Sequence, residues 1–67
     1  MTTRIYTDGN CYKKVAGVLY CAALDGYEGN VIEDSWVEVD FARIGPFERR
    51  EADFMFTRLD DEATVAV

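Results

Sequence analysis

The chain contains no histidine, only two cysteines and a single proline in 67 residues. Without histidine, the Ser-His, Cys-His and metal-His arrangements of many enzymes are absent. Two cysteines supply neither the ligands of a structural zinc site nor the disulfide framework that holds many very small domains together. We therefore predict free, partly buried thiols at Cys11 and Cys21, and no metal or cofactor.

Long apolar runs are also missing. The longest uncharged run covers residues 15–24, whereas a membrane-spanning helix needs about twenty apolar residues. The first residues show no apolar segment behind a basic start, so we expect no signal peptide. These features predict a cytoplasmic protein without a membrane partner.

Basic residues are scarce, because 7 Lys and Arg face 13 Asp and Glu and the net charge is −6. Binding of DNA or RNA by the chain itself is not expected, since phosphates are neutralised by clustered bases. Carboxylate pairs such as Glu33 with Asp34, or Glu38 with Asp40, are acid–base candidates in principle. A chain of this length leaves little room for a closed cleft, so we predict no enzyme and no catalytic residues.

Apolar residues are plentiful at 49%, and nine residues are aromatic, which predicts one compact domain over residues 1–67. Residues 2–7 alternate weakly and lead into a turn at residues 8–10, which indicates a short first strand. Residues 15–24 are apolar on both faces and suit either a strand or a helix. Gly17 in their middle costs a helix about 1 kcal/mol relative to Ala, which favours a central strand.

Residues 35–41 have the alternation of a half-buried strand. Its core face is formed by Val37, Val39 and Phe41, and its solvent face by Trp36, Glu38 and Asp40. We expect this strand to pair with residues 18–20 as an antiparallel hairpin with a long polar loop.

Residues 47–60 predict a helix that starts at Pro46. Proline is favoured at the first helical position, and Ala52, Met55, Phe56 and Leu59 recur at i, i+3, i+4 and i+7. The alternative is a hairpin with a last strand at residues 64–67. The predicted fold is α+β: a small antiparallel sheet of three to four strands with one C-terminal helix packed on one face.

The negative charge is concentrated in one part of the chain. Residues 15–42 contain no Lys or Arg, but they contain six acids, which equal the whole net charge. Glu38 and Asp40 would lie about 6.6 to 6.8 Å apart on a strand, close to two base-pair rises of DNA. Trp36 on the same face adds a side chain that is enriched at interface hot spots. The predicted partner-binding residues are Asp25, Glu28, Glu33, Asp34, Trp36, Glu38 and Asp40.

In these general features the chain resembles the small acidic, phage-encoded anti-CRISPR proteins that inhibit type I effector complexes. The resemblance rests on length, on the acidic run from Asp25 to Asp40 and on the absence of catalytic or targeting features, and on no family motif. It implies an inhibitor, in the host cytoplasm, that binds the CRISPR surveillance complex and blocks DNA binding.

From the residues themselves, we expect the partner to be a basic nucleic-acid-binding protein or ribonucleoprotein complex, with the acids mimicking phosphate charge. We expect a monomer or weak homodimer. The alternative is a generic protein-interaction module, or a small phage regulatory protein, that binds through apolar contacts.

Overall fold

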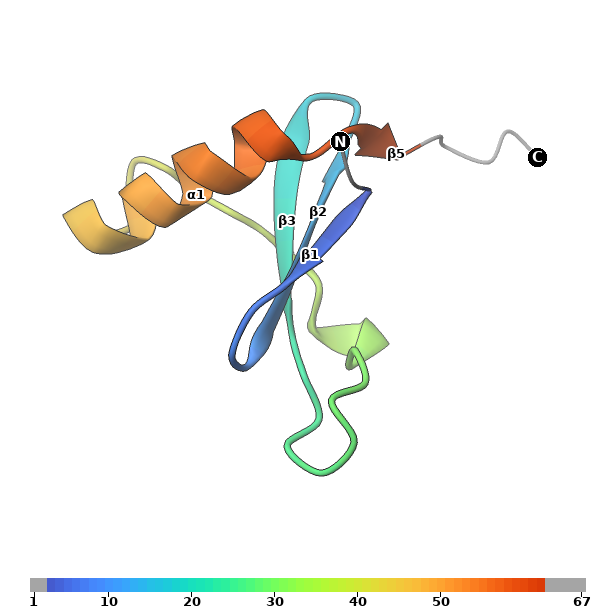
Figure 1. The fold of residues 1–67 in the computed structure, drawn as a ribbon. Coiled ribbons are helices and arrows are strands. Elements are labelled where there is room, and N and C mark those ends of the chain that lie inside the picture. Colours follow the sequence, from blue (N-terminus) through green and yellow to red (C-terminus); the bar gives the residue numbers. More distant parts are fainter. Residues whose placement is uncertain (1–2, 63–67) are drawn as a thin grey trace.

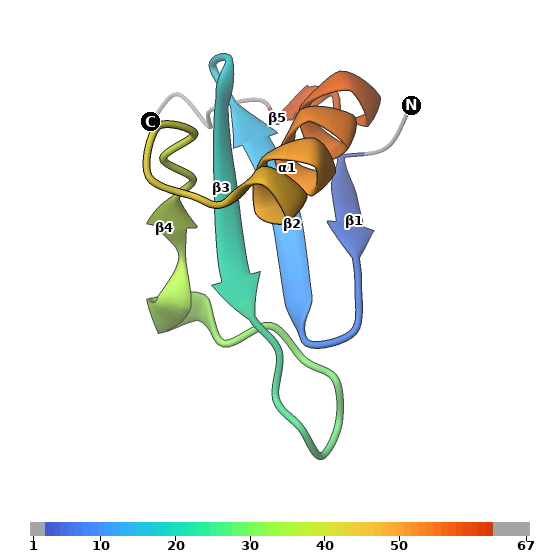
Figure 2. The same cartoon turned by 90° about the vertical axis from the view of Figure 1, so that its left-hand side faces the viewer.

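The computed structural model describes residues 3–62. Its sheet contains the antiparallel strands β1 (Arg4–Tyr6), β2 (Asn10–Val15), β3 (Val18–Ala23) and β4 (Val37–Glu38), in this spatial order. The helix α1 (Pro46–Arg58) covers one face of the sheet (Figures 1 and 2). This confirms the predicted α+β fold with one C-terminal helix, and it decides for the helix over the hairpin in residues 47–60.

A short fifth strand, β5 (Asp61–Glu62), pairs in parallel with the end of β2. Because β3 pairs along the whole of β2 on one side, β1 and β5 share the other side of β2. Arg4 Nε donates to Glu62 Oε1 at 2.9 Å and ties these two short strands together. Sequence analysis did not predict β5, and the alternative strand at residues 64–67 lies outside the described residues.

The predicted central strand at residues 15–24 is a strand, but its bounds are wrong. Ala16 and Gly17 form a two-residue turn with φ of 50° and 80°, and Val15 pairs with Val18 across it. Positive φ at both turn positions matches the right-handed twist of the flanking strands. Gly17, which disfavours a helix, is therefore the second residue of the turn between β2 and β3.

The predicted strand at residues 35–41 is also shorter than expected. A 3₁₀ turn, η1 (Glu33–Ser35), precedes it, and only Val37–Glu38 pairs with β3, antiparallel as predicted. The strand stops because Asp40 starts a turn: its Oδ1 accepts from the Ala42 N–H at 3.0 Å. Phe41 thus lies outside the strand, although it and Val39 still pack against the core.

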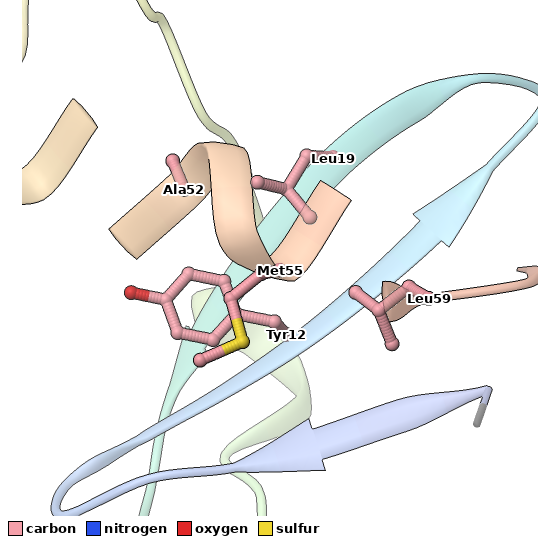
Figure 3. Close-up of a cluster of buried hydrophobic side chains, with 5 residues drawn as sticks. All are labelled: Tyr12, Leu19, Ala52, Met55 and Leu59. Carbon is pink, nitrogen blue, oxygen red and sulfur yellow. The ribbon is translucent and has the colours of Figure 1, made fainter. Parts of the chain in front are cut away.

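The core lies between α1 and the sheet. Tyr12 from β2 and Leu19 from β3 contact the helix residues Ala52 and Met55 and its C-terminal cap Leu59 (Figure 3). All five side chains are buried. The predicted helical stripe is therefore confirmed at three of its four positions.

Phe56, the fourth position of that stripe, is an exception. It stays 37% exposed and packs edge to face against Phe41, with ring centroids 6.4 Å apart. It therefore lies at the margin of the core.

The other face of the sheet is closed differently. Cys11 and Ala22 are paired neighbours on this face and are almost fully buried. Figure 1 shows η1 on the side of the sheet opposite α1, and the Ala23 N–H holds it there by donating to Ser35 Oγ at 2.8 Å. Trp36, which follows η1, lies beside Lys13 of this face.

Candidate acidic interaction surface

The six acids predicted to bind a partner lie in residues 25–40, which we call the acidic segment. It leaves the end of β3 as a loop, passes through η1 and returns along the outer edge of the sheet as β4 (Figure 2). A bridge between Leu24 and Val31 closes the loop at its base. The fold therefore gathers these acids at one end and one edge of the sheet.

The two acids of the loop shape its turn. Asp25 Oδ1 accepts from the Tyr27 N–H at 2.8 Å, and Glu28 Oε2 accepts from Asn30 Nδ2 at 2.9 Å. Asx turns of this kind are the usual local bonds of aspartate in loops. Glu28 remains exposed, whereas Asp25 is half-buried at the base of the loop, so Glu28 is the more accessible charge of the two.

Trp36 does not project into solvent as predicted. It is half-buried, its Nε1 donates to Glu33 Oε2 at 2.7 Å, and Lys13 Nζ lies 4.1 Å from its ring centroid. Arg4 Cζ lies 5.4 Å from the same ring. Two cations over the aromatic face draw the ring onto the sheet, so the prediction of an open anchor beside Glu38 is wrong.

Glu38 and Asp40 do not form the predicted outward pair on one strand. The strand ends at Glu38, whereas Asp40 bonds within its own turn and pairs with Arg43 Nε at 3.5 Å. Among the described residues, the carboxylates of Asp34 and Glu38 make no hydrogen bond or ion pair, and both residues are exposed. These two acids are the most available charges of the segment.

Basic side chains are mostly occupied within the protein. Six of the seven contact a carboxylate, a carbonyl or an aromatic ring: Arg4, Lys13, Lys14, Arg43, Arg49 and Arg58. Only Asp40 of the acidic segment has one of these bases, Arg43, as an ion-pair partner. The other five acids of the segment have no ion-pair partner among the described residues, although Lys13 and Arg4 lie over Trp36 within it.

A pocket of about 350 Å³ lies between the first half of α1 and the strands β3 and β4. Its wall is largely apolar, and three acidic residues are among those that line it. The lining residues are Tyr12, Cys21, Val37, Val39, Ile44 and Ala52, with Glu38, Asp40 and Glu48. Sequence reasoning missed this pocket and Glu48, because residues of four separate segments come together only in the folded chain.

Buried ionisable groups line both faces of the hairpin. Burial raises the pKa of the Tyr12 hydroxyl, which donates to Glu51 Oε1 at 3.1 Å. Burial also raises the pKa of the Cys11 and Cys21 thiols. Both thiols are free, and the register puts them on opposite faces of the sheet, where they cannot bridge.

Over residues 3–62, no group of three or more Cys, Asp or Glu residues could hold a metal ion. In the same residues, no helix is long and apolar enough to cross a membrane.

We found no match to a protein-family model, to a curated protein or to a solved structure.

Proposed function

We propose that the protein is a cytoplasmic, non-enzymatic inhibitor that binds a basic nucleic-acid-binding protein or ribonucleoprotein complex and competes with its DNA. A type I CRISPR surveillance complex is the partner implied by the resemblance in character. The observation that carries the proposal is the division of charge: acids line one end and edge of the sheet, while six of seven bases are engaged in internal contacts.

This division favours a basic partner for a physical reason. A surface of one sign attracts a partner of the other sign and repels like-charged competitors. Asp34 and Glu38 can each meet a partner cation without first breaking an internal bond. Glu38 and Asp40 lie in different local structures, so their spacing does not mimic that of two phosphates. The overall field of the acidic segment supports the proposal.

A pair of double variants tests the proposal in a competition assay with a purified surveillance complex and labelled target DNA. Asp34→Lys with Glu38→Lys reverses the two open charges of the acidic segment. Asp53→Lys with Asp61→Lys is the matched control, because it also changes the net charge from −6 to −2 and both sites are exposed and lie outside the acidic segment.

We expect the first double variant to lose at least about tenfold in inhibition, since each reversal replaces attraction with repulsion. The control should change far less. Equal losses in both variants would reduce the effect to net charge, and normal inhibition by a folded Asp34→Lys/Glu38→Lys protein would refute the role of the acidic segment. Raising the salt from about 50 to about 500 mM should also weaken the binding, through screening.

One observation favours the alternative of an apolar interaction module. Phe47 and Phe54 lie two helical turns apart on the outside of α1 and are 85% and 53% exposed. Serine at both positions should leave the core intact, because neither belongs to it. Binding that is lost in this variant but insensitive to salt would favour the apolar module over the acidic inhibitor.

A further inference from the structure

The outer side of α1 carries two exposed aromatic side chains. Phe47 and Phe54 are 85% and 53% exposed, and neither belongs to the core beneath the helix. Because they are seven residues apart, they lie on one side of the helix, about 10 Å apart along its axis. Figure 2 shows α1 in front of the sheet, where no other described element covers this side. Exposed aromatic side chains that lie together are typical of interaction surfaces.

Arg50 lies between the two phenylalanines on the same side of the helix, three residues after Phe47 and four before Phe54. Among residues 3–62 it makes no hydrogen bond, ion pair or contact with an aromatic ring, unlike the other six bases. Glu51 follows at the margin of this side. Its Oε1 accepts from the Tyr12 hydroxyl at 3.1 Å, which leaves Oε2 for a second donor. We call Phe47, Arg50, Glu51 and Phe54 the outer helix face.

The order of these four residues is symmetric about a point between Arg50 and Glu51. When two copies of α1 pack antiparallel about a two-fold axis at this point, Phe47 lies beside Phe54 of the second copy. In the same arrangement, Arg50 lies beside Glu51 of the second copy. Each contact then occurs twice, as in the isologous interface of a symmetric dimer. The outer helix face is therefore complementary to itself.

Charge favours a second copy on this face. The helix α1 is neutral, because it contains as many bases as acids, whereas the whole protein carries −6. These residues are Arg49, Arg50, Arg58, Glu48, Glu51 and Asp53. Two copies that met through the acidic segment would bring like charges together, which is unfavourable. A neutral helix with an open base and an open carboxylate oxygen avoids this repulsion.

We propose that the outer helix face joins two copies of this chain into a weak dimer, with their α1 helices antiparallel. This dimer goes beyond the proposed function and does not rest on it. Covering a whole phenylalanine buries about 150–250 Å², so the exposed parts of Phe47 and Phe54 supply about 200–350 Å² per copy. A standard stable interface buries about 800 Å² per partner. We therefore expect a dissociation constant between about 10 μM and about 1 mM.

Sedimentation equilibrium of the protein alone measures this association. The average mass should rise from 7.6 kDa at low concentration towards twice that value as the concentration approaches about 1 mM. Phe47→Ser with Phe54→Ser should weaken the association at least about tenfold, with an unchanged circular dichroism spectrum because the core is untouched. Tyr27→Ser is the matched control, since Tyr27 is 99% exposed outside α1, and it should not change the association.

A charge exchange tests the antiparallel register. Arg50→Glu and Glu51→Arg should each weaken self-association, because each variant places like charges opposite one another across the two-fold axis. An equimolar mixture of the two variants restores both ion pairs and should associate as the unmodified protein does. Asp53→Arg makes the same change of charge as Glu51→Arg at another exposed position of α1, and it should leave the association unchanged.

Three results would overturn the proposal. One is a constant mass of 7.6 kDa up to about 1 mM, and another is a dimer that Phe47→Ser/Phe54→Ser leaves intact, because a different face would then form it. The third is a mixture of the charge-exchanged variants that associates no better than either variant alone. If the protein stays monomeric and Phe47→Ser/Phe54→Ser loses the partner, the face belongs to the partner instead. None of these results bears on the acidic segment, which Asp34→Lys/Glu38→Lys tests separately in the competition assay.

Discussion

The two faces of the β2–β3 hairpin are buried by different chemistry. On one face, Leu19 and Leu59 meet in an apolar core beneath α1 and are 2% and 1% exposed. On the other face, Cys11 is equally buried, but the aromatic ring on this side, that of Trp36, is held by charged side chains. Here the second face is completed with cations.

Two bases of the second face have partners within the fold. Lys13 and Arg4 are used over Trp36, and Arg4 also pairs with Glu62. Neither base forms an ion pair with an acid of the acidic segment. The architecture of the second face therefore leaves the charges of Asp34 and Glu38 available to a partner.

Truncating a side chain on the helix face should lower the free energy of unfolding more than truncating one on the second face. Leu59→Ala removes a side chain that is 1% exposed at the end of α1, where its backbone N–H still caps the helix by bonding Met55 O at 3.0 Å. Such truncations cost about 2–5 kcal/mol, while a domain of this size is usually stable by only about 3–5 kcal/mol. Urea unfolding followed by circular dichroism should show a largely unfolded variant, and a loss below about 1 kcal/mol would contradict the assignment of this core.

Mutations on the second face should cost less stability than mutations on the helix face, but they should change the exposure of Cys11. Trp36→Ala should cost about 1–3 kcal/mol, below the range for a fully buried aromatic residue, because Trp36 is half-buried. It should also make the Cys11 thiol react faster with a labelling reagent under native conditions. Tyr27→Ala is the control, since Tyr27 is 99% exposed and should change stability by less than about 0.5 kcal/mol. An unchanged Cys11 rate would show that Trp36 does not protect this face.

The contrast between faces also explains what the sequence could and could not predict. Pro46 and the apolar spacing of Ala52, Met55 and Leu59 depend on local rules, and the helix was found. The β2–β3 turn was missed because Ala16 adopts a positive φ that alanine rarely takes. An Asn-Gly pair at residues 16 and 17 would have indicated the turn.

Strand β2 was also not predicted, because its residues do not follow the usual pattern of a strand. Its Lys13 and Lys14 point to opposite faces, and each covers an aromatic ring, Trp36 and Phe56 respectively. Adjacent charges of this kind do not match the apolar alternation of a half-buried strand. The position of Trp36 depends on Arg4 and Lys13, which are distant in sequence, so no local pattern could have predicted it.

Alkaline pH should lower the stability of the protein through groups on both faces. Burial raises the pKa of Cys11, Cys21 and Tyr12 in the folded protein, whereas in the unfolded chain thiols titrate near about 8.5 and tyrosine near about 10. The stabilising contribution is fully present below the unfolded pKa and is lost as the pH rises from there through the folded pKa.

Urea midpoints measured from about pH 8 to about pH 10.5 should therefore fall. Cys11→Ala and Cys21→Ala remove one thiol from each face, and each should flatten the early part of this fall. Midpoints that stay constant over this range would contradict the burial of these groups.

The smallest expected effects come from the two adjacent lysines, which allow the faces to be compared most directly. Lys13 Nζ lies 4.1 Å from the ring centroid of Trp36, and Lys14 Nζ lies 4.4 Å from that of Phe56 while donating to Phe56 O at 2.9 Å. Methionine keeps most of the aliphatic stem and removes the charge, so each variant should lose about 0.5–1 kcal/mol, the usual size of a cation–π contact near the surface. The free energy of unfolding alone will not separate the two variants.

The rate at which Cys11 is labelled under native conditions should separate them. Lys13→Met loosens Trp36 and should speed the labelling, whereas Lys14→Met acts on the helix face and should leave the rate unchanged. Equal acceleration in both variants would mean that the hairpin opens as one unit, and that the two faces are not closed independently.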